Sequence, residues 1–197
     1  MTTRTIIFSL VLFTFITSNS FCQNKFPDKI IMNDSTTVFG KVIKYRPAFF
    51  SFFGSRTSYI KFKNQKGQKT KYKPDSIKGF YIGSKKYTTV KNFKIHPIAS
   101  EYEIDFAQVI LEGKLNLYLH FGSSNDGINS TYYRRYIVCD NQQNECIGVY
   151  SRSRVNRELS ELLNNQEDLK QIVLNEKVNN INFYDLILEY NKRENNN

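Results

Sequence analysis

The spacing of apolar residues changes once along the chain, close to residue 151, and this change fixes the class of fold. From about residue 28 to 150, apolar and polar residues alternate in short runs separated by turn residues, as the two faces of β-strands require. After Ser151, apolar residues recur every three or four positions, as on one side of a helix. The pattern predicts an α+β fold: an antiparallel β-sheet or partly open barrel of about 8 to 10 short strands, followed by three short C-terminal helices.

The first residues are typical of a secretory signal. Arg4 is followed by the eleven-residue apolar run Ile6 to Ile16, and then by small and polar residues up to Cys22. As a helix, this run falls well short of a hydrocarbon core about 30 Å thick, so it fits a cleaved signal and not a membrane anchor. Export to the periplasm, the envelope or the exterior is expected. The alternative is a lipoprotein acylated on Cys22, which the bulky Phe21 before it disfavours.

Four segments are therefore expected along the chain. They are a signal peptide at 1–22, an antiparallel β-domain at 23–152, a helical element packed on it at 153–192, and a disordered tail at 193–197. No other stretch is long and apolar enough to cross a membrane, so the exported chain is expected to be soluble or peripheral.

Positive charge gathers in one part of the sequence. The formal net charge is +10, and residues 61–94 hold eleven lysines and a single acidic residue, Asp75. Once the predicted signal and its Arg4 are removed, the charge of this stretch accounts for the charge of the whole chain, and the remainder is nearly neutral. This distribution excludes a uniformly basic, histone-like protein.

Alternation places five of these lysines on one face of a predicted hairpin. Its strands, 59–63 and 69–73, are joined by a turn at Gly67, and the lysines occupy every second position. They are Lys61, Lys63, Lys69, Lys71 and Lys73. Like charges held so close repel one another, so a nearby anion would be stabilising. Tyr59 shares the face and is placed to stack on a sugar or a base.

The expected partner of this hairpin is anionic lipid, lipopolysaccharide or an acidic glycan. Nucleic acid is less favoured, because the export signal takes the chain away from the genome. Two explanations without a ligand compete with binding: lysines on exposed strands block edge-to-edge aggregation, and an AT-rich genome encodes many lysines. Genome composition does not explain why acidic residues avoid the same stretch.

Phenylalanines interrupt the alternation between Arg46 and Gly54. Four of them fall within five positions, and such a group is unfavourable in water. We expect a loop that folds back on the core or docks on a partner. Its phenylalanines are Phe49, Phe50, Phe52 and Phe53.

Two cysteines, Cys139 and Cys146, remain after the predicted signal. An even number in an exported chain favours a disulfide, which would close the short polar segment between them; the alternative is two reduced thiols at neighbouring strand ends. Without another cysteine or a nearby histidine the pair makes a poor metal site. No metal and no cofactor are predicted.

The sequence offers little for catalysis. His96 precedes a proline, His120 lies on the expected polar face of a hairpin, and no zinc-protease, serine-hydrolase or phosphate-loop motif is present. Glu101, Glu103 and Asp105 alternate as a glycosidase pair would in part require, but a solvated acidic loop is the simpler interpretation. A protein that is not an enzyme is predicted.

Several short sequence motifs occur together in the chain. They are VFGKVIKY at 38–45, YIKFK at 59–63, YKPDSIKGF at 72–80 and QVILEGKLNLY at 108–118. With Gly83, Tyr87 and an ending at Glu189–Asn191, they resemble a family of exported, functionally uncharacterised, β-rich cell-envelope proteins of Bacteroidota. The resemblance spans most of the chain after the signal. It implies a bacterial envelope protein and, because its motifs are turns and strands, no catalytic residues.

These features together predict an exported, non-enzymatic envelope protein of structural or binding type. Its expected contact is an anionic surface or glycan, made through the lysine-rich hairpin. A nucleic-acid binder and a hydrolase of envelope polymers are the alternatives.

Overall fold

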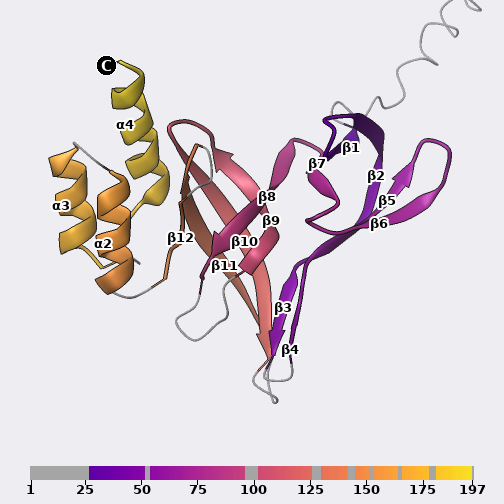
Figure 1. Ribbon diagram of the computed structural model, residues 1–197, viewed down its shortest axis with the longest axis horizontal. Helices are drawn as coiled ribbons and strands as arrows, with labels where there is room; N and C mark the ends of the chain where they lie inside the picture. The colour runs from indigo at the N-terminus through magenta and orange to yellow at the C-terminus, as the bar shows by residue number, and fades with distance from the viewer. Residues whose placement is uncertain are drawn as a thin grey trace, which may run out of the picture.

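The structure is a computed structural model that covers most of the chain after the predicted signal (Figure 1). The residues it describes are 27–51, 54–95, 102–125, 130–141, 145–150, 153–163, 166–177 and 181–196. All structural statements below refer to these residues. The predicted signal with Cys22, and the side chains of Phe52, Phe53, His96 and Glu101, lie outside them.

Strands precede helices in the chain, which confirms the predicted α+β class (Figure 1). The described strands are β1 (Asp28–Met32), β2 (Thr37–Arg46), β3 (Ala48–Ser51), β4 (Gly54–Arg56), β5 (Tyr59–Asn64), β6 (Lys69–Tyr72), β7 (Ile77–Ile82), β8 (Lys85–Phe93), β9 (Tyr102–Leu111), β10 (Leu115–Asn125), β11 (Ser130–Asp140) and β12 (Cys146–Gly148). The described helices are α2 (Ser153–Leu162), α3 (Glu167–Asn175) and α4 (Phe183–Asn195). Residues 193–195, predicted to lie in a disordered tail, belong to α4, where the contacts of Arg193 hold the last turn. The strands outnumber the prediction because β3 and β4 form in the phenylalanine-rich segment, for which the sequence predicts a loop.

All the described strands belong to one sheet, and the sheet does not close on itself. Its main path runs β12-β11-β10-β9-β8-β7-β1-β2-β5-β6, and neighbours along the path are antiparallel. β3 and β4 leave this path. They pair with each other, and β3 also pairs in parallel with the far end of β10.

One long, bent hairpin carries the chain from β2 to β5. Its base is the β2–β5 pair, and its outer part is the β3–β4 pair (Figure 1). The two arms change direction at Pro47 and at Ser58, each of which lies between two strands. Proline has no N–H to donate, so Pro47 cannot continue the ladder of β2. Beyond it the outer part turns towards β10, where Ala48 is paired with Gly122.

The apolar residues form cores at both ends of the sheet. The three helices gather at the β12 end (Figure 1), where residues such as Leu163 pack against Leu117 of β10 in one core. Most of their apolar side chains are buried, whereas Ile172 and Leu174 of α3 are 41% and 46% exposed. A second core, which includes Phe62 and Phe80, lies at the other end, under β1, β5 and β7. None of the described helices has the length and apolarity needed to span a membrane.

Two asparagines fix the position of α4. Asn182 caps the helix, because its side-chain oxygen accepts a hydrogen bond from the backbone N–H of Asp185 at 3.4 Å. Asn191 is buried and pairs with the backbone of Leu115 in β10, donating to its carbonyl at 2.8 Å and accepting from its N–H at 2.9 Å. A Cβ at Gly113 would collide with the Asn191 side chain, so only glycine leaves room for this contact.

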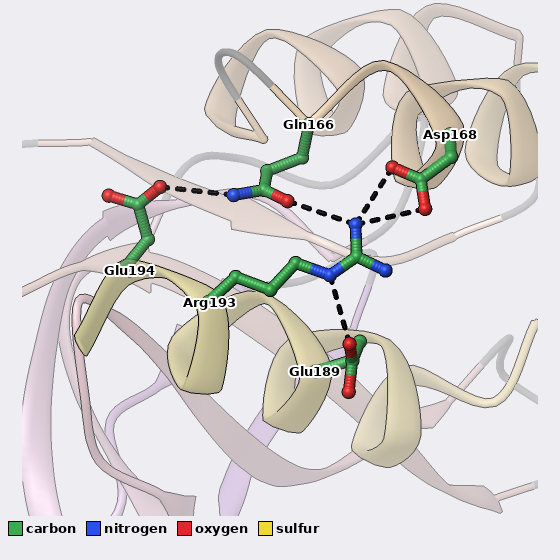
Figure 2. Close-up of polar contacts among 5 residues, drawn as sticks. All are labelled: Gln166, Asp168, Glu189, Arg193 and Glu194. Carbon is green, nitrogen blue, oxygen red and sulfur yellow. Dashed lines mark hydrogen bonds and ion pairs between the residues drawn. The ribbon is translucent and has the colours of Figure 1, made fainter. Parts of the chain in front are cut away.

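An arginine on α4 ties this helix to the start of α3 (Figure 2). The Nη1 atom of Arg193 donates to both carboxylate oxygens of Asp168 at 2.9 Å and to the Oε1 atom of Gln166 at 3.1 Å. Its Nε atom donates to Glu189 at 2.9 Å, and Gln166 donates in turn to Glu194 at 3.3 Å. The fixed fork of the guanidinium suits several acceptors at once.

This network predicts a stability difference that depends on pH. Hydrogen bonding to Arg193 lowers the pKa of Asp168 below its ordinary value, so its contribution is present above the unfolded pKa and disappears as pH falls through the folded one. Arg193→Gln is expected to lower the melting temperature at pH 7, and the difference from wild type should shrink below about pH 4. Thermal unfolding from acid to neutral pH measures it, with Lys192→Gln as the control. A difference that stays constant down to the lowest pH would contradict the assignment.

A disulfide joins Cys139 in β11 to Cys146 in β12, with an S–S distance of 2.09 Å. The two residues are also direct neighbours across the strand pair. Within the segment that the bond closes, the N–H of Asp140 donates to the carbonyl of Glu145 at 3.1 Å. The disulfide therefore holds the last strand on the edge of the sheet.

Candidate functional site

Six lysines form two rows across the neighbouring strands β2, β5 and β6. The first row consists of Lys41, Lys63 and Lys69. The second consists of Lys44, Lys61 and Lys71. Directly opposed residues of adjacent strands project from the same face, with Cβ atoms about 5 Å apart. All six side chains are exposed, and we call these six residues the lysine face.

The core on the other side of the strands fixes the direction of these lysines. Ile60 and Phe62 alternate with the lysines of β5 and are only 0% and 1% exposed. In β2, a bulge at Ile43 inserts one residue into the ladder, so Lys41 and Lys44 are both paired with outward-facing lysines. Four of the five predicted hairpin lysines share a face, and β2, which the prediction left out, extends it.

The lysine face has no acidic partner among the described residues, since none of the ion pairs formed there includes any of its six members. Lys73, the fifth lysine of the predicted patch, follows the end of β6 in a turn, where its backbone N–H donates to Ser76 at 2.9 Å. The positive charge of the lysine rows is therefore not neutralised by any ion pair among the described residues.

Tyr59, also a predicted site residue, touches the lysine face. The ammonium of Lys71 lies 4.1 Å from the centroid of the Tyr59 ring, a cation–π contact that covers one side of the ring. Burial raises the pKa of the Tyr59 hydroxyl, but the charges of Arg46 and neighbouring lysines and a hydrogen bond with Arg46 outweigh it, so the pKa is lowered. The phenol lies in a positive potential.

A cleft of about 850 Å³ lies beside the lysine face, where the long hairpin bends. Its walls come from both arms of the hairpin, from β6, and from the ends of β10 and β11. Four lining residues are basic, and none of the described lining residues is acidic. The basic residues are Lys44, Arg46, Arg56 and Lys71. Two of them, Lys44 and Lys71, also belong to the lysine face, so the cleft and the face are continuous.

Aromatic rings line the same cleft. Phe49 of the phenylalanine-rich segment contributes from β3, Tyr59 from β5 and Tyr132 from β11. Tyr132 is 80% exposed, an unusually open position for so large a ring. The fold thus brings one of the four predicted docking phenylalanines together with the lysine-rich hairpin. Phe50 lies next to it in β3.

A buried polar cluster holds the bend in place. Ser58, between the cleft residues Thr57 and Tyr59, donates its hydroxyl to Asp105 Oδ1 on β9. The other oxygen, Oδ2, lies 2.8 Å from Nε2 of His120 on β10. The side chains of Ser58, Asp105 and His120 are fully buried. The carboxylate therefore connects the hairpin bend to two strands of the sheet.

The buried cluster also includes groups without a hydrogen-bond partner among the described residues, namely His120 Nδ1 and the Tyr45 hydroxyl. Burial, and then the charges of Asp105 and Tyr87, raise the pKa of Tyr45 well above its ordinary value. Tyr45 lines the cleft and its ring lies 5.6 Å from that of Phe80, so it connects the cleft to the core. No three described His, Cys, Asp or Glu side chains lie together as a metal site would require.

Comparisons were made with protein-family models, with curated proteins and with solved structures. None of them found a match. The site is therefore interpreted from its own geometry.

The structure corrects two expectations about residues considered for catalysis. His120 is not on a polar face, because Phe93 and Tyr102 pack against its ring at centroid distances of 5.2 Å. Asp105 is not in a solvated acidic loop, because it lies in β9 with both oxygens bonded inside the protein. Glu103, two residues earlier in the strand, is exposed as expected. No pattern in one strand reveals the burial of Asp105, which depends on His120 and Ser58, 15 and 47 residues away along the chain.

Proposed function

We propose that this chain is an exported, non-enzymatic binding protein of the cell envelope whose lysine face holds an anionic surface or glycan. The observation that carries the proposal is the pair of lysine rows, in which like charges are direct neighbours on three strands. The signal-like segment 1–22 supports export. Phosphates of lipid or lipopolysaccharide and acid groups of a glycan supply the complementary charge.

Electrostatics favour a ligand at this face. Like charges directly opposite one another destabilise a strand pair, and here each lysine of β5 faces a lysine on both sides. Two unit charges about 4 Å apart repel by about 1 kcal/mol even in water, and the repulsion grows where solvent is excluded. An anionic surface removes this repulsion for several residues at once.

Protection of the sheet edge explains only part of the arrangement. β6 ends the strand order, so Lys69 and Lys71 can block pairing with another chain. Lys61 and Lys63 lie on β5, which is hydrogen-bonded to β2 on one side and to β6 on the other. They guard no edge, and a binding role accounts for them.

The test is vesicle and glycan binding by the purified protein at low salt. Sedimentation with phosphatidylglycerol vesicles, lipopolysaccharide and polygalacturonate is expected, with none for phosphatidylcholine vesicles or dextran. Changing Lys61, Lys63, Lys69 and Lys71 to Gln should weaken binding by at least about tenfold, because several charge contacts are lost together.

A control variant separates the lysine face from net charge. It carries Gln at four lysines of the opposite end of the molecule, Lys114, Lys170, Lys177 and Lys192. This variant should bind nearly as well as wild type. The proposal would be contradicted if the protein bound none of the anionic probes, or if the two variants weakened binding equally.

A further inference from the structure

We propose that the cleft at the bend of the long hairpin binds one sugar ring that carries a carboxylate or phosphate group. The inference rests on the proposed function and gives the anionic partner a chemical class, an acidic glycan. The lysine face would hold the charged chain, and the cleft would select one of its units.

The size of the cleft fits a small ligand. Its volume of about 850 Å³ lies within the roughly 300–1,000 Å³ typical of small-molecule sites. The lysine face beside it is formed by regular strands and offers charge without a cleft. Selection of one unit of a polymer requires a concave site, which the cleft supplies.

Two arginines supply a directional site for the acid group. Arg46 ends β2 and Arg56 ends β4, so they approach the cleft from opposite arms of the hairpin. A guanidinium presents paired N–H donors that match a carboxylate or phosphate, whereas a lysine acts as a point charge. Lys44 and Lys71 add positive potential, and no described lining residue opposes them with a negative charge.

Tyrosine and hydroxyl groups supply contacts for the ring of the sugar. Tyr59 and Tyr132 present aromatic surface on which the apolar face of a pyranose can pack, and each ends in a hydroxyl. Thr57 and Ser123 add hydroxyl groups to the same lining, and these can exchange hydrogen bonds with those of a sugar. An aliphatic chain would leave these polar groups unpaired, which disfavours a lipid tail in the cleft.

The cleft is formed before a ligand arrives. Ser58 anchors one arm of the bend to buried Asp105, and on the other arm Ala48 is 0% exposed and paired with Gly122 of β10. A site held in this way loses little conformational entropy on binding.

The experiment is calorimetric titration of the full protein with short sugars. The probes are tetragalacturonate, its methyl ester, glucose 6-phosphate, inorganic phosphate and adenosine monophosphate. Tetragalacturonate or glucose 6-phosphate should bind, whereas the ester and free phosphate should bind at least about tenfold more weakly, as expected on loss of hydrogen bonds to a charged group. Which of the two sugars binds more tightly identifies the acid group.

Matched variants locate the binding. Arg46→Gln with Arg56→Gln should raise the Kd for the short sugar by at least about tenfold. Lys177→Gln with Lys192→Gln removes the same charge from the helical element, which contributes no described residue to the cleft, and should change the Kd by less than about threefold. Tyr132→Ala should weaken sugar binding without reducing vesicle binding.

The possible failures are distinguishable. If vesicles and polymer bind but neither short sugar does, or if both double variants weaken the sugar equally, the cleft inference is wrong and the proposed function stands. Tighter binding of adenosine monophosphate than of either sugar would also overturn the inference. If neither polymer, vesicle nor sugar binds, the proposed function itself fails.

Discussion

Asp105→Ala is expected to lower the free energy of unfolding by about 3–5 kcal/mol, because its loss leaves several buried donors unpaired and each such group costs about 1–3 kcal/mol. Asp105 and His120 are both 0% exposed, and the carboxylate also accepts the Ser58 hydroxyl and the backbone N–H of Phe106. The substitution leaves these donors buried without an acceptor. Chemical denaturation measures the loss.

Glu103→Ala is the matched control, because Glu103 is a carboxylate on the same strand but exposed. Its effect should stay within about 0.5 kcal/mol, as for most surface substitutions. An Asp105→Ala protein within about 1 kcal/mol of wild type would show that the buried cluster does not hold the fold.

Lys61→Glu combined with Lys63→Glu is expected to act in opposite directions on stability and on binding. Each residue lies between two lysines of neighbouring strands, so the change turns like-charged neighbours into oppositely charged ones. The free energy of unfolding should rise by about 1 kcal/mol at low salt. Binding to anionic vesicles should be lost, because the middle strand of the lysine face then repels the surface.

The control for this pair is Lys177→Glu with Lys192→Glu, which changes the net charge equally on the helical element. It should leave vesicle binding close to wild type. If the β5 variant is less stable than wild type, the rows do not repel as argued. If it still binds, the lysine face is not the contact surface. Chemical denaturation measures the stability, and vesicle sedimentation measures the binding.

Much of the lysine face follows from local alternation. Because Ile60 and Phe62 must be buried, the lysines that alternate with them in β5 must point outwards. Lys69 and Lys71 share that face through their pairing with Lys63 and Lys61 in the predicted hairpin. The contribution of β2 depends on its register with β5 and on the bulge at Ile43. Neither can be predicted from the alternation of residues within one strand.

The cleft and the buried cluster could not be predicted from the sequence, because both depend on non-local pairing. Phe49 lies in a run without alternation, and the parallel pairing of its strand with β10 leaves no mark in either segment. Pro47 predicts the end of a strand, since a proline interrupts the hydrogen-bond ladder. It does not predict the direction of the chain beyond that point. Likewise, nothing near His120 shows that an aspartate from β9 and a serine from the hairpin bend meet there.

The most direct measurement for the proposed function is the salt dependence of binding to phosphatidylglycerol vesicles. Exposed charges are screened over about 10 Å at 0.1 M salt, so the affinity of the wild-type protein should fall by at least about tenfold between roughly 0.03 and 0.3 M salt. The Lys61→Glu, Lys63→Glu variant should show little binding at any salt concentration. Wild-type affinity that does not change with salt, or a variant that follows the same curve, would contradict an anion-binding lysine face.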